Sequence, residues 1–313
     1  MIISKVIGVF IIVFVGLGAN KIGWLPVGAS KYLSAIVIKI AAPCVVIVAM
    51  SEQELGSGSL EIILIVICIS ACQHFFAIPT GMLTNRLMGV QPEHRGIYKN
   101  FLIFTNNGFM GFPVALAMFG HDGLFYMVLA NSVMNVFIFT IGTTNLKSDN
   151  ESRLTFWQKV KEFILGMLDA PVIAMIVGFA LLIFQVHLPV EITDVLSSIG
   201  NVMAPLSMIV IGLQLTESKP KEVISNHRLI IISALRLLIL PGIFLGVMLL
   251  LRIDPLITCV LTLNAMLPCA TVPVVLAEAH GRDSKLAAEG TFLSTLFSMA
   301  TIPIGGILLT SLL

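Results

Sequence analysis

The sequence predicts an all-α polytopic membrane protein, and three observations lead to that class. Hydrophobic residues make up 57% of the 313 residues and charged residues only 11%, whereas soluble domains carry about 25% charged residues. The apolar residues are gathered in runs of about 20, which is the length of helix that crosses a bilayer. Two of these runs are interrupted near the middle by glycine, proline and asparagine, as in the broken helices of many transporters.

Ten apolar runs are long enough to be transmembrane helices. They cover residues 5–22, 31–51, 60–88, 98–119, 122–145, 164–186, 193–216, 226–251, 255–279 and 284–312. The first run follows Lys5 as the core of a signal peptide would. The internal repeat described below requires this run, so we expect it to be retained as a span.

Basic residues are concentrated in the loops that follow the odd-numbered spans. Fourteen lysines and arginines lie there, against only Lys5 and Arg252 on the opposite side. An excess of Lys and Arg marks the cytoplasmic side of a membrane protein. We therefore expect these five loops in the cytoplasm, and both termini outside the cell membrane.

Proline and glycine positions recur about 162 residues apart, which indicates two related halves. The matching positions are Leu25-Pro26 and Leu188-Pro189, Ala42-Pro43 and Ala204-Pro205, Pro79 and Pro241, and Gly120-His121-Asp122 and Gly281-Arg282-Asp283. Each half has five spans, an odd number, so the second copy enters the membrane from the opposite side. The sequence predicts a 5+5 inverted repeat: residues 1–146, a cytoplasmic linker over 147–161, and residues 162–313.

The interruptions lie in the fourth and ninth spans, and we expect these two helices to cross at the membrane midplane. The residues that hold the breaks open are Gly108, Gly111, Pro113, Pro268 and Pro273. Non-helical backbone at this depth is tolerated only where it is buried in protein or lines a wet cavity. Since the two spans run in opposite directions, the positive ends of their second halves converge on one centre, an arrangement that suits an anion.

Polar side chains near the breaks are the candidate substrate-binding residues. They are Asn106, Asn107, Asn131, Asn135, Asn264 and Thr271. The asparagines at the breaks either bind the substrate or repair the broken backbone. Asn131 and Asn135 either line the same cavity or join neighbouring helices, and Thr271 is a candidate cap of the second half-helix. Neither break carries a carboxylate of the kind that binds a hard cation, which favours an anion over sodium.

Four further polar residues lie in or near apolar spans, where ionisable groups usually serve a function. They are Gln73, His74, Arg236 and Glu278. We expect them to support charge or coupling. His74 either titrates near neutral pH or is a buried, hydrogen-bonded ring, and Arg236 either attracts an anion or pairs with Glu278.

The sequence gives no signal for an enzyme, a cofactor, a metal site or a nucleic-acid partner. It contains no catalytic or nucleotide-binding motif. Its five cysteines lie in apolar segments without a zinc pattern. The partners that remain are the lipid bilayer and a small substrate.

Three stretches carry a resemblance to a known family. They are Asn107–Pro113, Ala204-Pro205 with Ile211–Leu215, and Leu267–Thr271 with Ala277–Gly281. Together they resemble the auxin efflux carrier family in its compact bacterial form, whose fold is related to that of the bile acid:sodium symporters. The resemblance implies a scaffold domain from spans 1–2 and 6–7, and a transport domain from spans 3–5 and 8–10. It also implies an elevator-type motion around the crossing, and a homodimer through the scaffold as in plant relatives.

The resemblance further implies a secondary active transporter of small organic anions, either carboxylates such as malonate or malate, or auxin-like acids. The glutamate that the sodium symporters place before the ninth-span crossing is absent, with Asn264 nearby. An Asp/Lys pair of some plant relatives is replaced around Gln73 and His74, so neither sodium nor proton coupling carries over. The alternatives are a ligand- or lipid-binding membrane sensor without net transport, and an anion channel.

Overall fold

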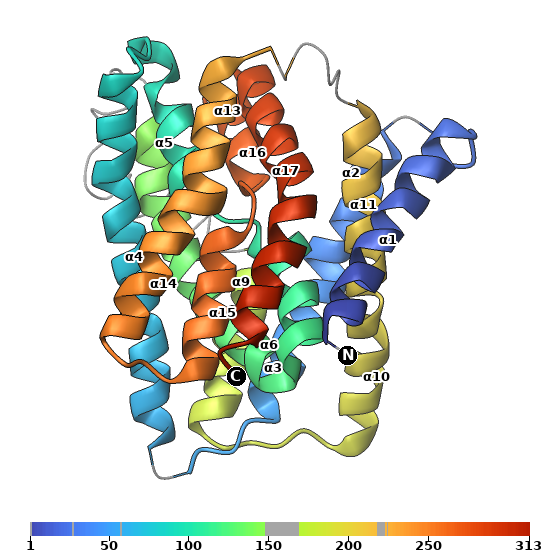
Figure 1. Ribbon diagram of the computed structural model, residues 1–313. Helices are drawn as coiled ribbons and strands as arrows, with labels where there is room; N and C mark the ends of the chain where they lie inside the picture. The colour runs from blue at the N-terminus through green and yellow to red at the C-terminus, as the bar shows by residue number, and fades with distance from the viewer. Residues whose placement is uncertain (1, 27, 57, 148–168, 218–222, 224) are drawn as a thin grey trace.

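The computed structural model describes residues 2–26, 28–56, 58–147, 169–217, 223 and 225–313. Within these ranges every regular element is a helix (Figure 1). The helices are α1 (Ile2–Lys21), α2 (Ala29–Ile36), α3 (Ala42–Ser51), α4 (Ser59–Leu87), α5 (Arg95–Ile103), α6 (Phe112–Phe137), α7 (Thr143–Leu146), α9 (Ala170–Ile183), α10 (Val190–Asn201), α11 (Met203–Glu217), α13 (His227–Ala234), α14 (Leu240–Leu250), α15 (Pro255–Met266), α16 (Val272–Ala279) and α17 (Ser284–Thr310). The predicted linker 147–161 lies outside the described residues except for Lys147.

Wide π-helical turns join several of these helices, and three of the four are explained by the prolines that follow them. The π segments are Val37–Ala41, Asn107–Gly111, Ile138–Gly142 and Leu235–Ile239. Three of them lead directly into a helix with proline in its first turn, namely Pro43, Pro113 and Pro241. A proline ring collides with the carbonyl four residues earlier in an α-helix, and the wider π turn relieves that collision while the span continues.

Six described helical runs are long and apolar enough to cross a membrane. They are Ala29–Ser51, Ser59–Leu87, Asn107–Leu146, Val190–Thr216, His227–Leu250 and Ser284–Thr310. Gly8–Lys21, Ala170–Ile183 and Pro255–Met266 are shorter apolar helices. This confirms the all-α membrane class. The count of ten stays a prediction, because it relies on these shorter helices and on dividing the long run at Gly120, whose φ of 71° is not helical.

Left-handed residues occur at matching places in the two halves of the chain. The pairs are Gly23 and Gln185 at the ends of α1 and α9, Gly89 and Arg252 after α4 and α14, and Gly120 and Gly281. Their separations follow the same spacing of about 162 residues as the prolines. Gln185 and Arg252 adopt a conformation that glycine normally takes, and they do so where the other half of the chain has glycine.

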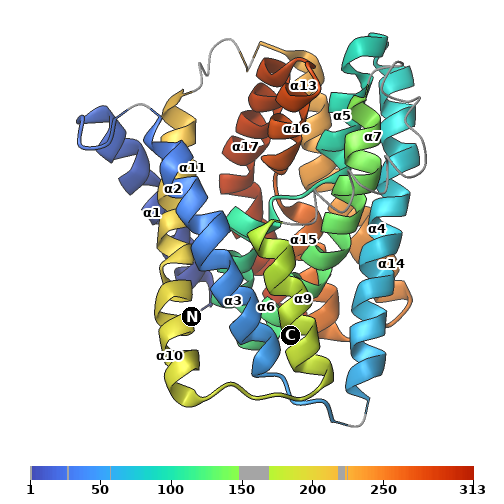
Figure 2. The same ribbon diagram turned by 180° about the vertical axis from the view of Figure 1, so that it is seen from behind.

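The helices form two neighbouring groups, seen from opposite sides in Figures 1 and 2. In the first group, α1 packs along α11, and α3 packs against α9 and α10. The second group holds α4 to α7 and α13 to α17. Glycines explain the closeness of α1 and α11, because a Cβ on Gly16 would overlap the carbonyl oxygen of Ile209, and one on Gly212 that of Val13. Small residues at such contacts let transmembrane helices approach closely.

Candidate functional site

The two predicted breaks meet and pair with each other. α5 ends at Ile103 and α15 at Met266, and the extended segments that follow form an isolated antiparallel bridge between Thr105 and Cys269. The Asn106 N–H donates to the Pro268 carbonyl at 2.9 Å, and the Ala270 N–H donates to the Phe104 carbonyl at 3.1 Å. Each break thereby satisfies part of the other's backbone, as buried non-helical segments must.

A second half-helix starts after each break. Asn106 caps the first, because its side-chain oxygen accepts the Phe109 N–H at 3.3 Å. Pro273 lies in the first turn of α16, where the missing N–H costs little, whereas Pro113 follows the π segment Asn107–Gly111 inside the first half-helix. Thr271 occupies the predicted cap position of α16, but its side chain makes no capping hydrogen bond. The prediction of a Thr271 side-chain cap was therefore wrong.

A buried polar network ties the breaks together around Thr105. The Thr105 hydroxyl lies 2.7 Å from Asn107 Oδ1 and 3.1 Å from Asn264 Oδ1. Asn264 in turn donates to Gln73 Oε1 at 3.1 Å. Sequence reasoning missed Thr105 as a site residue, because its hydroxyl acquires these roles only when a partner 159 residues away is brought beside it.

A cavity of about 100 Å³ lies where the two half-helices start. Its polar lining consists of Thr105, Asn106, Asn107, Asn131, Asn135 and Thr271, and its other walls come from α3, α6, α9, α11 and the π segments beside them. No charged side chain is among its lining residues. The predicted asparagines of α6 therefore share one cavity with the first break, whereas Asn264 lies behind it, in contact with Thr105.

Backbone at the start of both half-helices borders this cavity. Gly108, Thr271 and Val272 line it, and they lie at helix starts, where N–H groups have no partner within the helix. A Cβ built on Gly108 meets nothing within 4 Å, so the glycine borders open space. Together with the positive ends of two helices, these donors make the cavity suitable for a negatively charged group.

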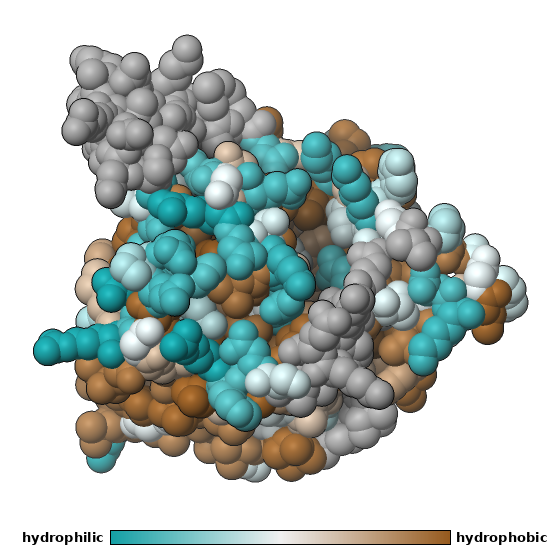
Figure 3. Space-filling model, turned by 90° about the horizontal axis from the view of Figure 1, so that it is seen from above, coloured by the Kyte–Doolittle hydropathy of each residue, from teal (hydrophilic) through white to brown (hydrophobic). Residues whose placement is uncertain are grey.

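Larger cavities adjoin this one on either side. One of about 440 Å³ lies between α11, α16 and α17 and reaches Thr271. Another, of about 320 Å³, lies between α3, α6, α10 and α11 and reaches Phe112 and Met203, which also line the central cavity. Figure 3 shows hydrophilic side chains gathered on the upper face of the molecule, with a hollow among them.

Arg236 donates hydrogen bonds to the C-terminal ends of α5 and α15, the half-helices that precede the breaks. Its guanidinium donates to the carbonyls of Phe101 at 2.9 Å, Leu102 at 2.7 Å and Leu267 at 3.1 Å. Arg236 is only 2% exposed, whereas Glu278 is exposed on α16. The alternative in which Arg236 pairs with Glu278 was therefore wrong. The last carbonyls of α5 and α15 compete successfully for the guanidinium because they need donors.

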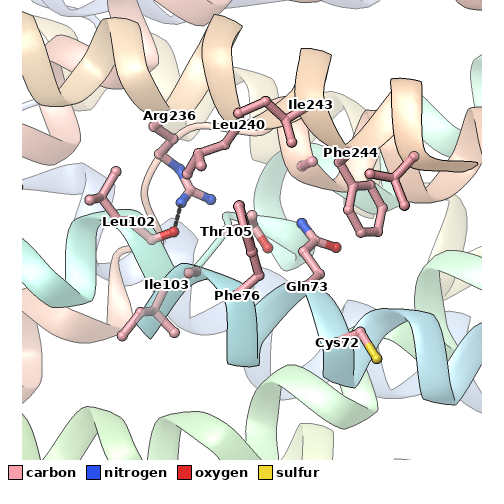
Figure 4. Close-up of a pocket in the computed structure, with 13 residues that line it drawn as sticks. Cys72, Gln73, Phe76, Leu102, Ile103, Thr105, Arg236, Leu240, Ile243 and Phe244 are labelled. Carbon is pink, nitrogen blue, oxygen red and sulfur yellow. Dashed lines mark hydrogen bonds between the residues drawn. The ribbon is translucent and has the colours of Figure 1, made fainter. Parts of the chain in front are cut away.

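Arg236 also borders an apolar groove of about 300 Å³ between α4 and α14 (Figure 4). Gln73 and Thr105 line this groove too, on the opposite side of the crossing from the central cavity, and Thr105 is common to both. The lining is otherwise almost entirely apolar.

His74 lies beside the site but lines none of these four cavities. Its ring is 1% exposed, packs 4.9 Å from the Phe137 ring between centroids, and places Nδ1 2.7 Å from the Ser70 carbonyl. These contacts correspond to the buried, hydrogen-bonded alternative. In the described residues no group of three or more His, Cys, Asp or Glu side chains is arranged to hold a metal ion.

Comparison with known proteins covers nearly the whole chain. An uncharacterized transporter of Methanocaldococcus jannaschii is 29% identical over 302 residues, or 95% of this chain and 96% of that protein. An uncharacterized transporter of Methanothermobacter thermautotrophicus is 26% identical over 321 residues, or 98% of each chain. Residues 1–305 match the family described as membrane transport protein, which includes the auxin efflux carriers. The resemblance inferred from the break motifs is thereby confirmed, and the chain belongs to the membrane transport protein family.

Proposed function

We propose that this membrane transport protein is a secondary carrier of a small organic anion, bound where its two broken helices cross. The observation that carries the proposal is the central cavity itself. Two half-helices begin at it, where the first N–H groups of a helix have no partner within the helix, and its other polar groups are neutral amides and hydroxyls. Such a lining stabilises a carboxylate without a metal ion.

The size of the cavity favours a compact substrate. Its volume of about 100 Å³ is smaller than that of either flanking cavity. A small dicarboxylate such as malonate or malate suits this space better than an aromatic auxin-like acid, which requires the cavity to widen toward its neighbours.

The cavities on both sides of the site support alternating access. We assign α1 to α3 and α9 to α11 to a scaffold domain, and α4 to α7 and α13 to α17 to a transport domain. Both flanking cavities lie between these two groups. An elevator-type displacement of one group along the other would widen one flanking cavity and narrow the other, and would carry the crossing with it. The matching left-handed residues support the inverted repeat on which such symmetry depends.

Counterflow in proteoliposomes tests this proposal. Vesicles preloaded with unlabelled malonate, malate or indole acetate receive the labelled acid outside, beside protein-free vesicles. Transient accumulation of one of these acids supports a carrier. Binding without accumulation supports the sensor alternative, and voltage-dependent current that is far faster than carrier turnover supports a channel. The absence of binding and exchange for every organic anion tested contradicts the proposal.

A further inference from the structure

The negative ends of the two broken helices converge on one buried guanidinium. Phe101 and Leu102 lie in the last turn of α5, and Leu267 directly follows α15. All three carbonyls accept hydrogen bonds of 2.7 to 3.1 Å from Arg236. The polarity is the reverse of that at the central cavity. The positive N-terminal ends of the second half-helices lie at the cavity, whereas the negative C-terminal ends of α5 and α15 lie at Arg236.

The charge of Arg236 is balanced by backbone rather than by a carboxylate. No ion pair to Arg236 is present among the described residues. Each helix end carries about half an elementary negative charge, so two ends together offset about one positive charge. An isolated charge is costly at this depth, and these carbonyls provide the compensation that a buried cation requires.

Carbonyl oxygens at broken-helix ends are also the ligands with which transporters hold small cations. We propose that Arg236 is a built-in cation that permanently fills a carbonyl site between the broken helices, so that the carrier needs no sodium or potassium ion there. An arginine does not lose its proton in a protein, so the site remains occupied at any physiological pH. This inference deepens the proposed function, because it makes anion binding independent of an alkali cation.

The position of the guanidinium gives it influence over the substrate cavity. Leu102 and Leu267 lie within three residues of the Thr105–Cys269 bridge, and that bridge positions the asparagines of the first break. A charge missing at Arg236 would leave the carbonyls of Leu102 and Leu267 without this donor, and that of Phe101 with only the weak thiol donor of Cys269, and would loosen the bridge. An external cation of suitable shape would restore both.

The test compares thermal unfolding of the purified wild type with that of Arg236→Ala, with and without about 10 mM guanidinium, which is far below denaturing concentrations. We expect Arg236→Ala to unfold at a lower temperature, and guanidinium to raise its midpoint by about 3 °C or more. The wild type should respond neither to guanidinium nor to replacement of choline by sodium or potassium at constant ionic strength.

Arg282→Ala is the matched control. Arg282 also donates to two helix-end carbonyls, those of Leu146 and Lys147, both at 2.8 Å, but it is partly exposed, so water can replace it. Guanidinium should therefore not stabilise Arg282→Ala. If Arg236→Ala does not fold, Arg236→Gln, which keeps an amide donor and removes the charge, takes its place.

Two results would overturn the inference. One is a wild type that sodium or potassium stabilises specifically. The other is a folded, neutral Arg236 variant that guanidinium stabilises no more than it stabilises Arg282→Ala. Neither measurement uses a substrate, so failure here is distinct from failure of the proposed anion transport.

Discussion

Thr105 is the residue on which the crossing depends most directly. Its hydroxyl lies 2.7 Å from the amide oxygen of Asn107 and 3.1 Å from that of Asn264, and the single hydroxyl proton serves these two acceptors. The residue is 2% exposed, so water cannot easily take its place. One side chain therefore connects the first break, the second break and, through Asn264, Gln73 of α4.

Replacing Thr105 by valine should destabilise the protein. The change preserves the shape but removes the one hydroxyl proton that the amide oxygens of Asn107 and Asn264 share, and a buried acceptor left without its donor costs about 1–3 kcal/mol. We expect a lower thermal midpoint and weaker anion binding, measured on purified protein. Thr105→Ser keeps the hydroxyl and should remain close to wild type. Equal behaviour of the valine and serine variants would show that the hydroxyl network does not hold the crossing.

The sequence predicted the backbone of the site better than its side-chain contacts. Glycine and proline act locally, so the interruptions and the first-turn position of Pro273 followed from residue type. Hydrogen-bond partners depend on segments that meet only in the fold. For that reason the pairing of Arg236 with Glu278 was wrong, the cap by Thr271 was wrong, and Thr105 was missed.

At the scale of elements, broken helices separate two kinds of electrostatic environment within a short distance. The starts of the half-helices face a cavity, and the ends of the preceding halves face Arg236. Two other spans also contain a proline, Pro43 or Pro241, but there a wide π turn precedes the proline and the helix continues. A proline alone therefore does not identify a break. The breaks differ because glycine and asparagine accompany proline at the first, and a second proline, Pro268, precedes Pro273 at the other.

The contact between α1 and α11 should be sensitive to a single methyl group. Gly16→Ala places a Cβ against the backbone of Ile209, whereas Gly18→Ala on the same helix meets nothing within 4 Å. We expect a lower thermal midpoint for Gly16→Ala, by an amount typical of overpacking at about 1–3 kcal/mol, and no loss for Gly18→Ala. Similar midpoints for the two variants would contradict the close packing of these helices.

At the scale of the whole molecule, the central cavity shares lining residues with both flanking cavities, Thr271 with one and Phe112 and Met203 with the other. The sequence predicted an all-α membrane protein, which the structure bears out, because composition and span length are global properties that tolerate local error. The cavities were not predictable in the same way. They depend on how the two helix groups pack, and no local pattern of residues specifies their size.

Alternating access predicts opposite changes in reagent access at the two flanking cavities. In a background without the five native cysteines, Gln214→Cys reports the cavity beside α16, and Ser197→Cys reports the one beside α6. Addition of a transported anion should change their rates of labelling by a water-soluble thiol reagent in opposite directions. Glu191→Cys, exposed at the start of α10, should label at a constant rate. Parallel changes at both reporters would contradict an exchange of access.

The central claim is that an anion occupies the cavity between the half-helix starts, and one substitution tests it most directly. Gly108→Ala adds a methyl group to open space in the cavity, so the fold should be retained while a substrate is displaced. Gly242→Ala, which also meets nothing within 4 Å but lies outside these cavities, is the control.

The measurement is the affinity of each purified variant for the transported carboxylate, by calorimetry, with thermal midpoints as the check on folding. We expect Gly108→Ala to bind about tenfold more weakly or worse, which corresponds to about 1.4 kcal/mol. Gly242→Ala should bind like the wild type. An unchanged affinity in a folded Gly108→Ala would contradict an anion site at the crossing of the two broken helices.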